Sequence, residues 1–148
     1  MGGTFAHSAS ADTLAIMNPA SGEELGRVTM STKADVDAAV QAATAAYPTW
    51  RSTPTPQRAR VLFRLKALIE EHKEELALLL TTEHGKVVAE TRGEIQRGIE
   101  NIEHACGMPT LMMGDTVEGI AEGIDSESWR QPIGVFGIIT PYNFPVMI

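Results

Sequence analysis

The fold of this chain is decided near its end by the stretch Val135-Phe136-Gly137-Ile138-Ile139-Thr140-Pro141-Tyr142-Asn143-Phe144-Pro145. Its first five residues are apolar or Gly and do not alternate with polar ones. This is typical of a strand covered on both faces, as in a parallel sheet between layers of helices. Pro141 and Pro145 then restrict the backbone, and Pro145 suits the first turn of a helix. The sequence therefore predicts a covered strand at 135–139, followed by a rigid turn that presents Asn143.

The earlier part of the chain predicts two short strands and then a helix. The apolar residues of 14–30 are sparse and β-prone, and turn-forming pairs interrupt them, which indicates two short strands joined by a turn. Ser31 or Thr32 can cap the helix that follows, in which apolar residues recur at a spacing of three or four. Pro48 is expected to close this helix.

Two further helices are expected. A long amphipathic helix runs from Thr55 through Leu80, and Gly85 suits the left-handed residue after a helix end. An ion pair between Glu83 and Lys86 is possible at that end. The next helix, about 86–107, carries an apolar stripe and, opposite it, a polar face. The stripe consists of Val88, Ile95, Ile99, Ile102 and Cys106, and the polar face of Glu90, Glu94, Arg97, Asn101 and His104.

Residues 116–133 alternate between apolar and polar types and contain Gly119 and Gly123, which predicts exposed antiparallel strands. At the other end of the chain, residues 1–13 are small and polar. They have neither a basic nor an apolar region of the kind found in signal peptides, so a disordered leader is expected there.

Composition argues against several classes of partner. The chain has 19 acidic and 12 basic residues, a net charge of −7, which disfavours binding to a polyanionic nucleic acid. Its apolar runs are far shorter than the ~20 residues needed to span a bilayer. A single cysteine cannot form an internal disulfide, which is consistent with a reducing cytoplasm. The four histidines show no metal-ligand spacing, so no metal is expected.

The segment Ile139-Thr140-Pro141-Tyr142-Asn143-Phe144-Pro145 resembles the Thr-Pro-aromatic-Asn-Phe-Pro segment of NAD(P)-dependent aldehyde dehydrogenases. Three other segments resemble the same family in the same order: Asn18-Pro19-Ala20-Ser21-Gly22-Glu23, Glu83-His84-Gly85-Lys86 and Trp129-Arg130-Gln131-Pro132-Ile133-Gly134-Val135. Residues 94–106 and 111–116 resemble the methylmalonate-semialdehyde branch, whose members make an acyl-CoA. The resemblance covers about residues 14 to 148.

The resemblance implies an α/β fold, the amino-terminal part of an aldehyde dehydrogenase. Strands and helices of the NAD-binding domain are expected at 14–115, and protruding antiparallel strands for oligomerisation at 116–133. The first strand of a Rossmann-like parallel sheet and the turn are expected at 134–148. Because the catalytic cysteine of this family and most of its dinucleotide-binding sheet are expected further on, the chain is interpreted as a fragment of a longer enzyme, inactive alone.

The resemblance also implies roles for particular residues. The Asn143 amide is expected to donate to the oxyanion of a thiohemiacetal, although Asn in a loop often only braces its own backbone. The backbone of Ile139, Thr140, Pro141 and Tyr142 is expected to border the NAD ribose, at the sheet edge where ligands bind. Two residues of this set have an equally good structural interpretation: Thr140 can serve as a capping hydroxyl and Tyr142 as a packing aromatic.

Arg97 has two readings. Glu94 and Glu100 lie three residues before and after it, so it can belong to a solvated, salt-bridged face. In the resembling branch an Arg at this position faces the substrate tunnel, where a guanidinium can bind the second carboxylate of a semialdehyde. Cys106, on the apolar stripe, is expected to be a buried structural residue.

The function expected is therefore NAD-dependent oxidation of methylmalonate or malonate semialdehyde to an acyl-CoA through an enzyme thioester, with coenzyme A as co-substrate, in a cytoplasmic homo-oligomer. Two alternatives remain open. One is a non-acylating aldehyde dehydrogenase that releases the acid. The other is a non-catalytic interaction module that pairs through residues 116–133.

Overall fold

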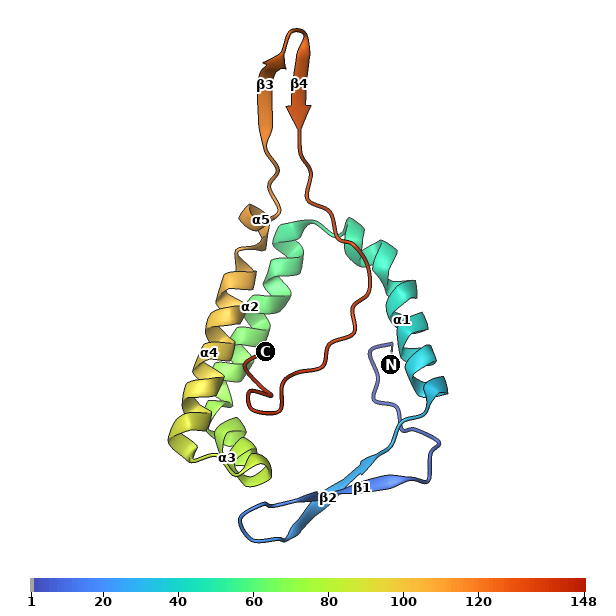
Figure 1. Ribbon diagram of the computed structural model, residues 1–148, viewed down its shortest axis with the longest axis vertical. Helices are drawn as coiled ribbons and strands as arrows, with labels where there is room; N and C mark the ends of the chain where they lie inside the picture. Colours follow the sequence, from blue (N-terminus) through green and yellow to red (C-terminus); the bar gives the residue numbers. More distant parts are fainter. Residues whose placement is uncertain (1) are drawn as a thin grey trace.

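The computed structural model describes residues 2–148; Met1, the first residue of the expected leader, lies outside them. Four long helices form the body, a β-hairpin lies at each end of it, and the last residues return along the helices (Figure 1). The elements are β1 (Thr13–Met17), β2 (Glu24–Thr29), α1 (Lys33–Ser52), α2 (Thr55–Glu71), α3 (Lys73–His84), α4 (Val88–Cys106), α5 (Met108–Leu111), β3 (Thr116–Ala121) and β4 (Ile124–Glu127).

Thr32 caps α1, as expected. Its hydroxyl accepts from the backbone N–H of Asp35, and the Asp35 carboxylate accepts from the backbone N–H of Thr32, which completes a capping box. The prediction that Pro48 closes this helix is wrong, because α1 continues to Ser52. A proline removes one intrahelical hydrogen bond and crowds the preceding turn, but here the last turn is held by the N–H of Thr53, which bonds back into the helix.

The long helix expected from Thr55 is in fact two helices, α2 and α3, separated at His72. The break redirects the chain so that α3 packs against α4, and Ala77 of α3 is fully buried there. Gly85 then ends α3 in the left-handed conformation with φ of 83°, as predicted.

The core is small and lies between α2, α3 and α4. Ala77, Ile95 and Ile99 form its centre, and Ile69 and Leu76 pack against it. The expected apolar stripe of α4 supplies two of these residues, and Cys106 is buried on the same helix, as predicted. The core fixes α3 and α4 relative to each other, and these two helices position the candidate site.

The strand expected at 135–139 does not form. Residues 128–141 contain no regular secondary structure, and Ile139 is 98% exposed. An isolated strand has no ladder to join, and the sheets among residues 2–148 are only the hairpins β1-β2 and β3-β4. The composition of 135–139 is typical of a strand, but among residues 2–148 no neighbouring strand lies where it could pair with this segment.

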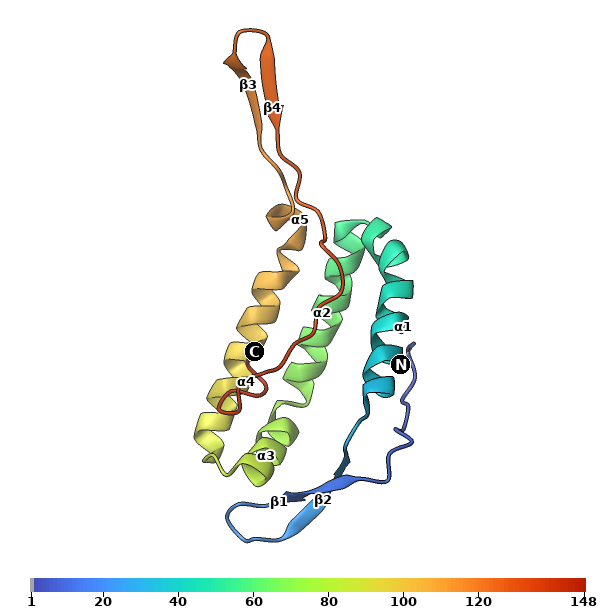
Figure 2. The ribbon, with the colours of Figure 1, turned by 45° about the vertical axis from the view of Figure 1, so that its right-hand side comes forward.

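The antiparallel strands predicted within 116–133 are present as β3 and β4. This hairpin projects away from the helices in both views (Figures 1 and 2). All of its strand residues are exposed. Its base is tightly closed: a Cβ on Gly114 would lie 1.6 Å from the backbone oxygen of Ser128, so only glycine fits there.

Candidate functional site

The candidate site is built around the turn at residues 141–147. After β4 the chain runs back past the helices and ends in a hooked turn beside α4 (Figures 1 and 2). The backbone N–H of Phe144 donates to the carbonyl of Pro141 at 3.2 Å, which closes the first part of the turn. Pro145 begins a second turn instead of the expected regular helix. One internal hydrogen bond does not fix such a segment, so its contacts with α3 and α4 decide its position.

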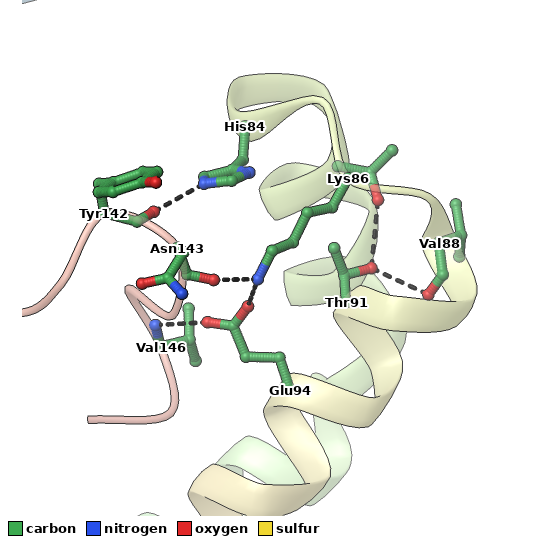
Figure 3. Close-up of polar contacts among 9 residues, drawn as sticks. His84, Lys86, Val88, Thr91, Glu94, Tyr142, Asn143 and Val146 are labelled. Carbon is green, nitrogen blue, oxygen red and sulfur yellow. Dashed lines mark hydrogen bonds and ion pairs between the residues drawn. The ribbon is translucent and has the colours of Figure 1, made fainter.

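The strongest of these contacts come from an ion pair between Lys86, in the loop after α3, and Glu94 of α4 (Figure 3). Lys86 Nζ lies 2.5 Å from Glu94 Oε2, and the two side chains are 16% and 1% exposed. The same ammonium donates to the carbonyl oxygen of Asn143 and lies 4.5 Å from the centre of the Phe144 ring. The other carboxylate oxygen, Glu94 Oε1, accepts from the backbone N–H of Val146 at 2.9 Å. The pair therefore holds the turn at Asn143 and at Val146.

Two further side chains hold the ends of the turn. His84 Nε2 lies 2.6 Å from the carbonyl oxygen of Tyr142 (Figure 3). Because a carbonyl only accepts, His84 carries a hydrogen on Nε2. Asn101 Nδ2 donates to the carbonyl oxygen of Met147 at 2.8 Å. Side chains from α3, the following loop and α4 thus bind four backbone groups within six residues.

The charge of Glu94 is set by competing influences. Burial is the largest one and disfavours the charged carboxylate. Hydrogen bonds from Lys86 and from the backbone N–H groups of Val146 and Met147, together with the charge of Lys86, outweigh it. The pKa of Glu94 is therefore below its ordinary value of 4.5, and the side chain is ionised at neutral pH.

Two expectations about these residues were wrong. Glu94 was placed on the polar, solvent-facing side of its helix, but it is buried under the turn. Lys86 was paired with Glu83 across the helix end, but it binds Glu94. The partners of Glu94 in the turn lie 52 residues along the chain, and helical periodicity carries no information on such contacts.

The Asn143 carboxamide makes no hydrogen bond with other residues of 2–148, so it does not brace its own backbone. It points away from Lys86 in Figure 3. It borders a cavity of about 560 Å³. The other residues that line this cavity are Lys86, Glu90, Gly93, Glu94, Arg97 and Phe144. An amide with a free N–H group beside a cavity has the chemistry of a donor to a bound oxygen.

Arg97 lies in the wall of the same cavity. Neither salt bridge expected from its sequence neighbours forms within residues 2–148. Glu94 binds Lys86 instead, and Glu100 makes no ion pair with Arg97. Among residues 2–148 its guanidinium has no charged partner. The structure thus brings Asn143 and Arg97, two of the predicted site residues, to one cavity and leaves the polar groups of both available.

The predicted cofactor wall, residues 139–142, is open to solvent. Ile139 is almost fully exposed and the Tyr142 ring is 86% exposed, while Thr140 is half-buried. The backbone of residues 133–140 makes no hydrogen bond within the described chain, so its N–H and C=O groups remain available. Such groups suit the hydroxyls of a ribose, and the segment fits the role of one wall of a nucleotide site.

The chain belongs to the aldehyde dehydrogenase family, whose sequence model matches residues 5–148. The expected family and fold class are confirmed. Helices and small antiparallel sheets match the amino-terminal part of solved aldehyde dehydrogenase structures.

The similar proteins include semialdehyde dehydrogenases. Malonate-semialdehyde dehydrogenase 1 of Geobacillus kaustophilus is 53% identical over 100% of this chain and 30% of its own length, and that of Geobacillus thermodenitrificans is 55% identical over 100% and 31%. A solved putative methylmalonate-semialdehyde dehydrogenase of Sinorhizobium meliloti, complexed with NAD, matches with a TM-score of 0.92 at 41% identity over 99% of this chain and 30% of that one. The methylmalonate-semialdehyde dehydrogenase of Oceanimonas doudoroffii gives 0.90 at 45% identity, over 95% and 29%. The chain thus spans about 30% of the length of the curated relatives it matches.

Within residues 2–148, no helix has the length and apolar character needed to cross a bilayer. Over the same residues, no three His, Cys, Asp or Glu side chains gather in a way that could hold a metal ion.

The lowered pKa of Glu94 predicts an acid-sensitive contribution to stability. A carboxyl whose pKa is lower in the folded state stabilises the fold above its ordinary value of 4.5, and this contribution is lost as pH falls through the folded-state pKa. The free energy of unfolding, measured by denaturant at pH 7 and at stepwise lower pH, should therefore decrease less in Glu94→Gln than in the unchanged protein. Glu100→Gln, an exposed change on the same helix, is the control. Equal pH dependence in all three proteins would contradict the assignment.

Proposed function

We propose that this chain supplies one wall of the active site of an NAD-dependent semialdehyde dehydrogenase that acts on malonate or methylmalonate semialdehyde. The observation that carries the proposal is that Asn143 and Arg97 line one cavity, and that the carboxamide and the guanidinium have no polar partner among residues 2–148. A semialdehyde of a dicarboxylic acid has two groups to recognise, a reacting carbonyl and a carboxylate. The names of the relatives agree with this substrate class.

Asn143 serves the carbonyl. In the family mechanism a cysteine thiolate adds to the aldehyde, and the carbonyl oxygen becomes an oxyanion of a thiohemiacetal. A pre-placed amide N–H stabilises this oxygen more strongly as its charge develops, by about 3 to 4 kcal/mol. The only cysteine here, Cys106, is buried on α4, so the nucleophile comes from outside residues 1–148.

Residues 139–142 serve the cofactor. NAD, when bound, accepts the hydride that leaves the thiohemiacetal carbon. The backbone of Ile139, Thr140, Pro141 and Tyr142 would border the ribose and so orient the nicotinamide toward Asn143. Within this segment, the polar backbone groups of Ile139 and Thr140 have no hydrogen-bond partner among residues 2–148, whereas the carbonyls of Pro141 and Tyr142 bind Phe144 and His84. This wall has one side only, and residues 1–148 alone should bind NAD weakly and show no dehydrogenase activity.

Three finer assignments belong to the same proposal. The acyl thioester passes to coenzyme A, as in the branch that residues 94–106 resemble. The exposed hairpin β3-β4 pairs with other subunits of a homo-oligomer, since its strand residues are all accessible. The enzyme acts in the cytoplasm. Product analysis with and without coenzyme A separates acyl transfer from hydrolysis.

Asn143→Ala should reduce turnover more than binding, because the lost hydrogen bond strengthens only in the transition state. In the complete enzyme that carries this chain, kcat should fall by about 100- to 1000-fold with little change in KM. Steady-state kinetics with Gln41→Ala, a change of an exposed amide on α1, provides the control. A kcat within a few-fold of the unchanged enzyme would remove Asn143 from the oxyanion site.

Arg97→Leu tests recognition of the carboxylate. Loss of a charged hydrogen bond should raise KM for malonate or methylmalonate semialdehyde by about 10- to 100-fold. Propionaldehyde has no second carboxylate, so its KM should change much less. Arg60→Leu removes an exposed arginine of α2 and should affect neither substrate. Equal effects of Arg97→Leu on both aldehydes would show that Arg97 does not read the carboxylate.

A further inference from the structure

The ion pair of Lys86 and Glu94 contacts the backbone immediately around the residue that the proposed function assigns to the oxyanion. Lys86 binds the carbonyl of Asn143 itself, and Glu94 binds the N–H of Val146, three residues later. The Asn143 side chain takes part in neither contact (Figure 3). The pair therefore fixes the backbone from which the Asn143 side chain extends, and it leaves the carboxamide of that side chain available to a ligand.

Both members of the pair are themselves held in place. Lys86 follows Gly85, whose left-handed conformation ends α3 and whose missing Cβ leaves room for Pro19; a Cβ there would lie 2.8 Å from Pro19 Cγ. Glu94 precedes Ile95, which is fully buried in the core. On the same helix, a Cβ at Gly98 would lie 3.2 Å from the carbonyl oxygen of Val146, so α4 and the turn approach closely.

The energetics of a buried ion pair indicate that it fixes the position of the turn more than it stabilises the fold. Removing two charges from water is costly, and a buried ion pair often stabilises a protein no more than apolar residues of the same size would. Each charge here also satisfies a backbone group of the turn, so the pair specifies one location for that segment. Catalysis is sensitive to such location, because a misplacement of about 1 Å can cost on the order of 100-fold in rate.

We propose that Lys86 and Glu94 are positioning residues for the reaction: they fix the backbone of the 141–147 turn so that the Asn143 amide meets the developing oxyanion. This inference rests on the proposed function of Asn143. Neither side chain touches the reacting atoms in this account. Both act through Asn143, and loss of either should therefore reduce turnover while leaving recognition of the aldehyde carboxylate by Arg97 largely intact.

A double-mutant cycle in the complete enzyme tests this inference. Lys86→Met and Glu94→Gln should each lower kcat by about 10- to 100-fold, with a much smaller change in KM for the semialdehyde. In the Asn143→Ala background the same changes should have roughly no more than a twofold effect, because the amide that they position is absent. Lys86→Arg, which keeps the charge and the donors, should recover part of the loss. Glu94→Gln is nearly isosteric and carries the test if Lys86→Met does not fold.

Lys66→Met is the matched control. Lys66 is a partly buried lysine that pairs with Glu70 and Glu103, and it forms no ion pair or hydrogen bond with the turn. The kcat of Lys66→Met should therefore be unchanged. Effects of Lys86 and Glu94 that add fully to that of Asn143→Ala would overturn the positioning role and leave the proposed function intact. If Asn143→Ala itself has no effect on kcat, the proposed function fails, and the positioning role fails with it.

Discussion

A carboxylate removed from water must regain its hydrogen bonds from the protein, and this requirement determines the partners of the buried Glu94 side chain. Glu94 is almost completely buried, and its two oxygens take an ammonium from Lys86 and a backbone N–H from Val146. The Lys86 ammonium also donates to the carbonyl of Asn143 and lies over the ring of Phe144. Because Lys86, Glu94 and the backbone of the turn satisfy one another, the positions of α3 and α4 determine the position of the turn.

Apolar burial alone would not hold this turn. The core lies between α2, α3 and α4, and the segment that leads to the turn has exposed apolar side chains and no backbone hydrogen bonds over 133–140. The last residues are instead attached by polar contacts from His84, Lys86, Glu94 and Asn101. A turn held by directional polar contacts is defined in orientation as well as in place, which is what the oxyanion donor proposed at Asn143 would require.

Features with local causes were predictable from the sequence. The capping hydroxyl of Thr32, the left-handed Gly85, the amphipathic α4 and the exposed hairpin β3-β4 all depend on residues close in sequence, and all are present. The resemblance around Asn143 also identified the correct family.

Features that depend on distant partners were not predictable. The buried state of Glu94 needs a backbone N–H from 52 residues away, and the break at His72 follows from packing of α3 on α4. The apolar stretch at 135–139 has the composition of a strand, but pairing requires a neighbour that composition does not reveal. The roles of Asn143 and Arg97 stay predictions from residue type and resemblance, whereas the ion pair that holds the turn became visible only in three dimensions.

Hydrogen–deuterium exchange of the turn tests most directly whether this ion pair holds it. Mass spectrometry of a peptide covering residues 142–148 would compare the protein that carries this chain with its Glu94→Ala variant, and with Glu103→Ala as a control on the same helix. Loss of a hydrogen bond to a charged group should accelerate exchange in the turn by about tenfold or more in Glu94→Ala alone. Unchanged exchange in Glu94→Ala would show that the turn is held by something other than the buried pair.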